Sequence, residues 1–293
     1  IEEGMLRAKQ NNWLASVLIE SDPNAQIINW SLAKIDVSTG EFIIQEGAEI
    51  NNLRQELIKL KAAEIISEKK SISNKSWHEG LINITEFNQT SFSKLEANAT
   101  IKNHYSLANI DGIGIDSDSM SIRTMGGLIA YLNKTHPIIN SELKNGVKTN
   151  ICIDYPQIKK KKTGLIIDNQ TRKNLELTST QKNGQFHGSL LWAIDKTLTS
   201  MGGRCIRRWL EEPLTDIDSI KNRQSIIGLL VQSSTLRRNI RKILKAMGDL
   251  ERLSGRAGAQ QAGARDLVAI AEGIKRLPII KGCLNNSIFE ETK

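Results

Sequence analysis

The spacing of the apolar residues changes along this chain, and that change limits the possible folds more than any other feature. Before residue 136, compact apolar runs alternate with segments of helical spacing, which is typical of mixed strands and helices. From Gly164 onward, apolar residues recur at gaps of three and four, the period of helices with one buried face. The chain therefore predicts an α/β part followed by an all-helical part. Its 293 residues are enough for two domains of ordinary size.

The first part contains a succession of short strands and helices. The run Trp13–Ile19 is rich in apolar residues and predicts a strand, while Leu32–Gln45 predicts a hairpin with glycine in its turn. Helical spacing follows in Asn51–Lys61, and Ala63–Ser67 predicts a short buried strand. A further helix is expected over Arg123–His136. This order of elements predicts a small α/β sandwich.

A junction separates the two parts. Residues 136–163 contain Pro137 and Pro156, followed by the basic run Lys159, Lys160, Lys161 and Lys162. Such a run is either a solvated surface or a set of phosphate contacts, and the sequence leaves both open. We therefore expect one domain over residues 1–135, a junction over 136–163 and a second domain over 164–293.

The second part is expected to be an array of helices. Short polar residues at the predicted starts, which can cap the free backbone N–H groups, mark several of them. Short turns between successive helices favour an antiparallel arrangement. The expected helices are Asn169–Leu177 capped by Asp168, a long one over Ser189–Leu210, one capped by Asp216, Thr235–Met247 capped by Ser234, one restarting at Asp249, and Arg265–Leu277, which ends before Pro278.

Two adjacent glycines interrupt the long helix. On a helical wheel, Gly202 lies within the apolar stripe beside Met201 and Cys205, whereas Gly203 lies on the opposite flank. A glycine in a helix interior costs about 1 kcal/mol relative to alanine, so a compensating contact is expected. We expect Gly202 to face a neighbouring helix and Gly203 to face solvent or a loosely packed flank.

The charge is unevenly distributed between the two parts. Residues 1–150 hold 15 Lys or Arg and 18 Asp or Glu, a net charge of −3, whereas residues 151–293 hold 25 and 14, a net charge of +11. A basic half is typical of proteins that bind nucleic acid or another polyanion. A solvated basic surface explains the composition equally well.

The sequence gives little sign of a membrane or of an oxidising compartment. No run of about 18 apolar residues is present, so no membrane-spanning helix and no membrane partner are expected. Three widely separated cysteines without a C-x-x-C pair favour neither a disulfide framework nor a zinc site, and fit a reducing cytoplasm. The chain begins with Ile1 rather than Met, so we expect a piece of a longer protein.

Catalytic motifs are scarce. No P-loop and no H-E-x-x-H pattern occur, and the four histidines are scattered, so we predict no catalytic, cofactor-binding or metal-binding residue in this chain. One enzyme hypothesis remains open, because an α/β sandwich with an early hairpin could be a nuclease of the ribonuclease H type. Such a site needs carboxylates that converge on two metal ions. The available acids are Asp36, Glu41, Asp116 and Asp118.

Three segments of the second part carry a family resemblance. They are "LIIDNQTRKNLELT", "SLLWAIDKTLTSMGGRCIRRWLEEPL" and "MGDLERLSGR". In this order and spacing they resemble the core region of the bacterial MutS mismatch-repair family, with Cys205 replacing an apolar residue. The stretches "IEEGMLRAKQNNWLASV" and "WSLAKIDVSTGEF" resemble the start of the connector domain of that family. Candidates for structural or signal-transmitting roles are Asp168, Thr171, Asn174, Glu176, Asp195, Gly202, Arg204, Arg207, Trp209, Asp249 and Arg252.

The resemblance implies a fold and a role. It implies a ribonuclease H-like α/β connector domain without that enzyme's active site, followed by the first part of an antiparallel helical core domain. A mismatch-reading domain would precede the chain, and a DNA clamp and a P-loop ATPase domain, which holds ATP and Mg, would follow it. The parent is then a DNA-dependent ATPase, usually a homodimer, that binds mismatched double-stranded DNA and recruits MutL. This chain would transmit conformational change and offer a docking surface, without being an enzyme itself.

Three classes of function therefore compete. The first is the linking and docking part of a mismatch-recognition ATPase, which the motifs favour. The second is the ribonuclease H-like nuclease, and the third is a free-standing basic module that binds nucleic acid, which only the +11 half supports.

Overall fold

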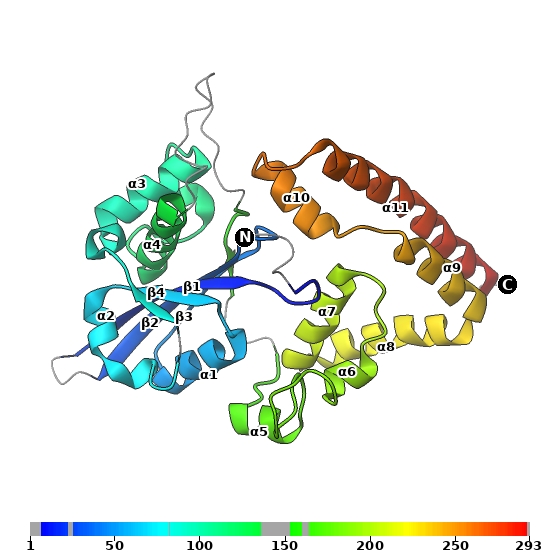
Figure 1. Ribbon diagram of the computed structural model, residues 1–293, viewed down its shortest axis with the longest axis horizontal. Coiled ribbons are helices and arrows are strands. Elements are labelled where there is room, and N and C mark those ends of the chain that lie inside the picture. The colour runs from blue at the N-terminus through cyan, green and yellow to red at the C-terminus, as the bar shows by residue number, and fades with distance from the viewer. Residues whose placement is uncertain (1–6, 23–25, 82, 136–152, 160–163, 292–293) are drawn as a thin grey trace. The chain divides into compact units, whose positions relative to one another are not determined.

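The computed structural model describes residues 7–22, 26–81, 83–135, 153–159 and 164–291. They form two compact units (Figure 1). The α/β unit takes in residues 12–160 with 258–260, and the helical unit takes in residues 1–11, 161–257 and 261–293. Most of the expected junction, including Lys160, Lys161 and Lys162, lies outside the described residues. The domain boundaries expected at residues 135 and 164 stay a prediction.

A six-stranded mixed sheet forms the centre of the α/β unit. Its strands lie in the order β5-β4-β1-β2-β3-β6. Neighbours β1 and β2, and β2 and β3, run antiparallel, whereas β4 runs parallel to β1, β5 to β4 and β6 to β3. The predicted first strand, hairpin and short buried strand are confirmed. The bounds are Trp13–Ser21 for β1, Ile27–Asp36 for β2, Phe42–Gly47 for β3, Glu64–Ser67 for β4, Ile84–Glu86 for β5 and Gln157–Ile158 for β6.

Both faces of this sheet are covered. Successive side chains of a strand point to opposite faces. In β1, Leu14 and Leu18 join a core that includes side chains of α3 and α4, whereas Ala15 and Val17 join a second core with side chains of α1. The unit is therefore a three-layer arrangement with one sheet between two helical layers (Figure 1). Its helices are α1 (Ile50–Leu60), α2 (Lys69–Ser73), α3 (Lys94–Tyr105) and α4 (Met120–Thr135), with short 3-10 turns at Lys75–Trp77, Gln89–Phe92 and Ile110–Ile113.

The predicted helices of the α/β unit are confirmed at α1 and α4, but the sequence did not indicate α3. Ser93 caps α3 by accepting a hydrogen bond from the backbone N–H of Glu96. Only Ala97 and Ile101 of this helix are buried. An apolar stripe of two residues is too short to give a recognisable helical period.

The helical unit contains seven helices in its described part. Asp168 and Asp216 cap α5 and α8 as predicted, each accepting a backbone hydrogen bond from three residues ahead. None of the described helices has both the length and the apolar character that crossing a membrane requires. The bounds are Asn169–Asn174 for α5, Leu190–Ile194 for α6, Ser200–Glu211 for α7, Ile217–Gln232 for α8, Ser234–Lys245 for α9, Leu250–Gly258 for α10 and Ala264–Glu291 for α11.

The long helix predicted over Ser189–Leu210 is wrong, because the chain breaks between α6 and α7. Asp195 leaves the helical conformation and accepts hydrogen bonds from the backbone N–H and hydroxyl of Thr197 at 2.9 and 2.5 Å. Thr199 then caps α7 by accepting a hydrogen bond from the N–H of Gly202 at 3.0 Å. Short polar side chains that bond nearby backbone groups compete with a helix, and here Asp195 and Thr199 both do so.

Three other expected boundaries are also wrong. Helix α5 ends at Asn174 rather than Leu177, because Glu176 takes a left-handed conformation with φ of 47°. Ser233 rather than Ser234 caps α9. Helix α11 continues through Pro278. A proline removes one backbone N–H and costs about 3 kcal/mol, but the turns on either side keep their hydrogen bonds.

The expected roles of the two glycines are reversed. A Cβ atom on Gly202 would meet Thr199 and Thr197 from the turn before α7, not a neighbouring helix. Gly203 is buried, and a Cβ atom there would lie 2.5 and 2.6 Å from Cγ and Cδ of Lys9. The expectation took the apolar stripe as the buried face of α7, but Cys205 and Trp209 of that stripe are exposed, whereas Gly203 and Arg204 are buried. Gly203 therefore permits the close approach of the Lys9 side chain.

We predict that Gly203→Ala destabilises the helical unit. The added methyl group must displace the middle of the Lys9 side chain, and overpacking of this kind typically costs about 1–3 kcal/mol. The matched control is Gly228→Ala in α8, where a Cβ atom meets nothing within 4 Å and a gain of up to about 1 kcal/mol is expected. Urea unfolding followed by circular dichroism measures both changes, and equal effects of the two substitutions would show that the Lys9 contact is not constraining.

Candidate functional site

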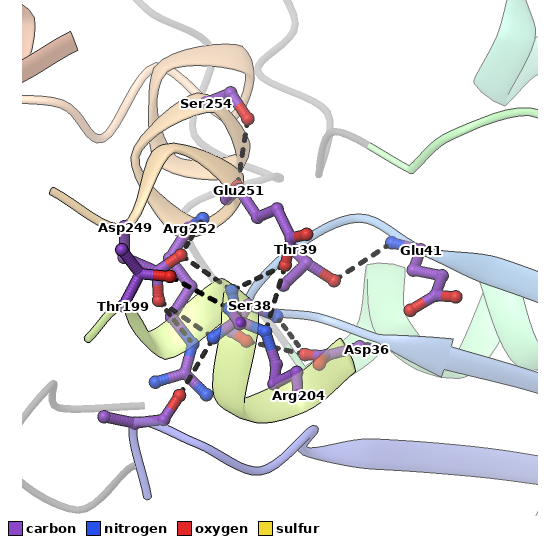
Figure 2. A network of polar contacts seen from close by, with 12 residues as sticks. Asp36, Ser38, Thr39, Glu41, Thr199, Arg204, Asp249, Glu251, Arg252 and Ser254 are labelled. Atoms are coloured by element: carbon purple, nitrogen blue, oxygen red, sulfur yellow. Dashed lines mark hydrogen bonds and ion pairs between the residues drawn. The ribbon is translucent and has the colours of Figure 1, made fainter. Parts of the chain in front are cut away.

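Arg204 of α7 is buried in the helical unit, with 2% of its surface exposed. Its Nε and Nη2 groups donate to Oε2 of Glu251 at 3.0 and 2.6 Å. Its two terminal nitrogens also donate to the two carboxylate oxygens of Asp249 at 2.8 and 2.7 Å (Figure 2). The remaining Nη1 proton goes to the backbone carbonyl of Ala8 at 2.9 Å. All five donors of the guanidinium group therefore have an acceptor.

The charges around Arg204 compensate for its burial. Burial alone lowers the pKa of Arg204, but the hydrogen bonds and negative charges of Asp249 and Glu251 raise it on balance. Burial raises the pKa of Asp249, but the hydrogen bonds and positive charges of Arg204 and Arg252 together bring it below the usual range. Removing a single partner would leave a poorly solvated charge behind, which is the most costly change that such a cluster can undergo.

The same cluster holds the segment 7–10, which precedes the first strand. Arg252 of α10 donates from Nη2 to the backbone carbonyls of Arg7 and Gln10 at 3.1 and 2.8 Å. Its Nε lies 3.9 Å from Oδ2 of Asp249. Together with the bond from Arg204 to Ala8, the backbone carbonyls of this segment accept three hydrogen bonds from two arginines. Segment 7–10, α7 and α10 are thus tied together by one polar network.

Lys9 adds a second tie between segment 7–10 and the break before α7. Its Nζ donates to Oδ2 of Asp195 at 2.9 Å and to the backbone carbonyl of Thr197 at 3.2 Å. Burial raises the pKa of Asp195, but the hydrogen bonds from Thr197 and Lys9 bring it below the usual range. The break between α6 and α7 therefore creates the binding site for the lysine.

Four other candidate residues lie around α5, apart from the arginine cluster. The carboxylate of Asp168 accepts hydrogen bonds from the backbone N–H and hydroxyl of Thr171 at 2.9 and 2.5 Å. These bonds from Thr171 lower the pKa of Asp168. Asn174 accepts a hydrogen bond from the Gln170 amide at 2.8 Å, and Glu176 accepts one from the N–H of Gln181 at 2.7 Å. These side-chain contacts are local, whereas the backbone carbonyl of Glu176 accepts a hydrogen bond from the N–H of Leu190, the first residue of α6, at 2.9 Å.

The last two candidates lie on α7. Arg207 lies 3.7 Å from Glu211, one turn further on, and burial lowers its pKa. Trp209 is 44% exposed, and the guanidinium group of Arg223 lies 3.6 Å from the centre of its ring. A cation over an indole face is attracted by its negative quadrupole. This pair connects α7 with α8.

The acids considered for a nuclease are not gathered into a metal site. The carboxylate of Asp36 accepts hydrogen bonds from the N–H of Asn12 and from Ser38, and Asp118 pairs with Lys94. In the described part of the chain, no group of three or more His, Cys, Asp or Glu side chains is placed to hold a metal ion. The geometry therefore lends the nuclease hypothesis no support.

Of the basic run Lys159 to Lys162, the structure describes only Lys159. The backbone N–H of Lys159 donates to the carbonyl of Ile44 at 2.9 Å, where β6 pairs with β3. The other three lysines of the run lie outside the described residues. Phosphate contact by this run stays a prediction.

Sequence reasoning missed three residues that hold the helical unit together. Glu251 lies inside the D-L-E-R-L motif between two named candidates, so the motif itself was its signal. Lys9 carried no signal, because its partner Asp195 is 186 positions away. Arg172 also went unnoticed, although it donates to the carbonyls of Ile167 and Glu211 at 2.9 and 2.7 Å and joins α5 to the end of α7.

Comparison with known proteins identifies relatives along the whole chain. A family model described as MutS domain II matches residues 12–141, and one described as MutS domain III matches residues 170–293. DNA mismatch repair protein MutS of Prochlorococcus marinus strain NATL1A is 79% identical over 293 residues, which is 100% of this chain and 32% of that protein.

More distant relatives carry the same name. The protein of Prochlorococcus marinus strain SARG is 50% identical over 287 residues, covering 98% of this chain and 31% of the relative. The protein of Parasynechococcus marenigrum strain WH8102 is 46% identical over 289 residues, covering 99% of this chain and 31% of the relative. The chain thus spans about a third of the length of the curated relatives it matches. The resemblance inferred from the motifs is confirmed.

We predict that Arg204→Met lowers the free energy of unfolding of the helical unit by about 3 kcal/mol. Breaking a buried ion pair by removing one partner typically costs 3–5 kcal/mol, and the partial exposure of Glu251 favours the lower end. The control is Lys275→Met, which breaks a pair with Glu272 in which the lysine side chain is 73% exposed. A change below about 0.5 kcal/mol is expected there. Urea titration compares the two variants, and similar losses would contradict the assigned role of Arg204.

We also predict that acid destabilises the helical unit through Asp249 and Asp195. Because their pKa values are lower in the folded state than in the unfolded state, ionisation of both groups favours folding at neutral pH. This contribution is fully present above the unfolded pKa of about 3.9 and is lost as pH falls through the folded pKa. Urea titrations between about pH 6 and pH 3 should show a fall in stability that is shallower for Asp249→Asn. An identical pH slope in the variant would contradict the depressed pKa.

Proposed function

Because the chain belongs to the MutS family of DNA mismatch repair proteins, we propose that it links the mismatch-reading and ATPase domains of a mismatch-recognition protein. In this proposal it comprises the connector domain and the first part of the helical core. The matches to MutS domains II and III, in that order along the chain, support the assignment. The activity of the whole protein belongs to the proposal, since this chain covers 32% of the relative from strain NATL1A.

We propose a ribonuclease H-like topology for the α/β unit. The antiparallel order of β1, β2 and β3, with β4 and β5 added parallel beside β1, supports it. For the helical unit we propose an antiparallel core. Short connections, such as that between α8 and α9 at Ser233, support this arrangement.

The observation that carries the proposed linking role is the network around Arg204. A signal passes between distant domains when packed elements move together rather than independently. Helix α10 and segment 7–10 cannot shift separately against α7 without breaking charge-assisted bonds to Arg204 or Arg252. A displacement that reaches the helical unit would therefore be passed to the segment that enters the first strand.

The partners follow from the same assignment. We propose that the parent binds mismatched double-stranded DNA, forms a homodimer, recruits MutL partly through the connector, and works in the cytoplasm. ATP and Mg would bind the P-loop ATPase domain of the parent, so this chain is not itself the enzyme. Lys159, Lys160, Lys161 and Lys162 remain our proposed phosphate contacts near the junction.

The test uses the full-length parent with Arg204→Met, numbered as in this chain. Binding of a G·T mismatch duplex is measured with and without ATP. We expect mismatch affinity without ATP to stay within about threefold, and the ATP-induced change in affinity to fall about tenfold, since coupling factors are typically 5- to 150-fold. The conservative variant Arg204→Lys should recover part of the coupling.

Folding of each variant is checked by circular dichroism, and Lys275→Met serves as the control that leaves coupling unchanged. Normal ATP coupling in a folded Arg204→Met protein would exclude the network as the linking element. A wild-type parent without any mismatch preference would exclude the family function itself.

A further inference from the structure

The most basic stretch of the helical unit lies outside the family motifs. Residues 219–248 contain seven Lys or Arg and no Asp or Glu. This stretch includes most of α8 and all of α9. Five of the seven cations belong to the 12-residue helix α9. A stretch that carries only positive charges attracts a polyanion, and it contains no acidic residue with which its own cations could form ion pairs.

The basic residues of α9 gather on one side of the helix. Its apolar residues face inward: Leu236 is 8% exposed, and Ile243 and Leu244 are partly buried. This side packs against α8 and α11, which lie next to α9 in Figure 1. The helical period places Arg238, Lys242 and Lys245 together on the opposite side, at i, i+4 and i+7, and all three are exposed.

Two other arginines of α9 fix the helix rather than face a ligand. Arg237 donates to the carbonyls of Leu230 and Val231 at 2.6 and 2.9 Å, which satisfies acceptors at the end of α8. Arg241 donates to the carbonyl of Lys196 at 3.1 Å, next to the break before α7. Within the described residues, Arg238, Lys242 and Lys245 have no hydrogen bond or ion pair of their own side chains. The helix is thus anchored by two cations and presents three.

We propose that Arg238, Lys242 and Lys245 form a contact surface for the phosphate backbone of double-stranded DNA. With a rise of about 1.5 Å per residue, these side chains cover roughly 10 Å along α9. A DNA strand carries one phosphate per about 3.4 Å of helix axis, so this length faces about three phosphates. The contact is non-specific, because no base edge needs to be reached.

The choice of DNA as the polyanion rests on the proposed function, since relatives of this chain are DNA mismatch repair proteins. The helix itself offers a regular row of cations on an anchored, rigid element. Anionic lipid would need apolar residues at the exposed side to enter the bilayer surface, and that side of α9 carries only polar and charged residues. A duplex backbone therefore fits the surface better than a membrane.

The experiment measures binding of this 293-residue chain to a fluorescent 30-base-pair duplex by anisotropy, between about 50 and 200 mM salt. The test variant is Arg238→Gln, Lys242→Gln and Lys245→Gln together, because glutamine keeps the side-chain length and the helix propensity. Each lost phosphate contact reduces the slope of log K against log salt by about 0.9, so the triple variant should lose about 2.7. The change should be the same for a fully paired duplex and a G·T duplex.

The matched control is Lys69→Gln, Lys70→Gln and Lys75→Gln, which removes the same charge from exposed positions of the α/β unit. Its slope should stay within about 0.5 of the wild type. Equal slope losses in the two triple variants would reduce the effect to net charge and overturn the proposal. An unchanged slope in the α9 variant would also overturn the proposal. Binding to phosphatidylserine vesicles is measured for the same variant. If it loses vesicle binding but keeps duplex binding, the three side chains contact lipid and the proposal is overturned.

The outcome is separable from that of the linking role. The α9 contact is read from the salt dependence on any duplex, whereas the linking role is read from ATP coupling in the parent. Failure of one leaves the other measurement unaffected.

Discussion

A guanidinium group removed from water needs an acceptor for every N–H and a negative charge nearby, and Arg204 imposes this requirement on the whole helical unit. Two carboxylates at the start of α10 and one backbone carbonyl of segment 7–10 meet it. Because two acceptors lie at the start of α10 and the third in segment 7–10, hydrogen-bond geometry fixes the position of both against α7. Bidentate arginine–carboxylate pairs hold such geometry more strictly than apolar contacts do.

The break between α6 and α7 belongs to the same arrangement. Lys9 donates to the carboxylate of Asp195 and to the backbone carbonyl of Thr197, and inside a continuous helix that carbonyl would accept the N–H four residues further on instead. The absence of a side chain at Gly203 then lets the stem of Lys9 lie against α7. Gly203, for which the sequence suggested no packing role, is thus the glycine on which the approach of segment 7–10 depends. The backbone N–H of the neighbouring Gly202 donates to the helix cap at Thr199.

Sequence reasoning succeeded where the cause of structure is local. The compact apolar run of β1, the turn between β2 and β3, and the caps at Asp168 and Asp216 all depend on residues within a few positions. It missed the break at Asp195, because a continuous apolar spacing outweighed the local bonds of Asp195 and Thr199, and the further contact from Lys9 lies 186 positions away. It missed α3, because two buried residues give no helical period. The motifs named Arg204, Asp249 and Arg252 as candidates, but only the folded structure brings them together with Lys9 and Glu251.

The central claim is that Arg204 and Asp249 act as one unit, and a double-mutant cycle measures this most directly. The free energies of unfolding of the wild type, Arg204→Met, Asp249→Asn and the double variant would be determined by urea titration at neutral pH. For two residues that share a buried network, we predict a coupling of about 2 kcal/mol, within the usual range of 0.5–3 kcal/mol. Effects that add within about 0.3 kcal/mol would show that the two side chains act independently and would contradict the account.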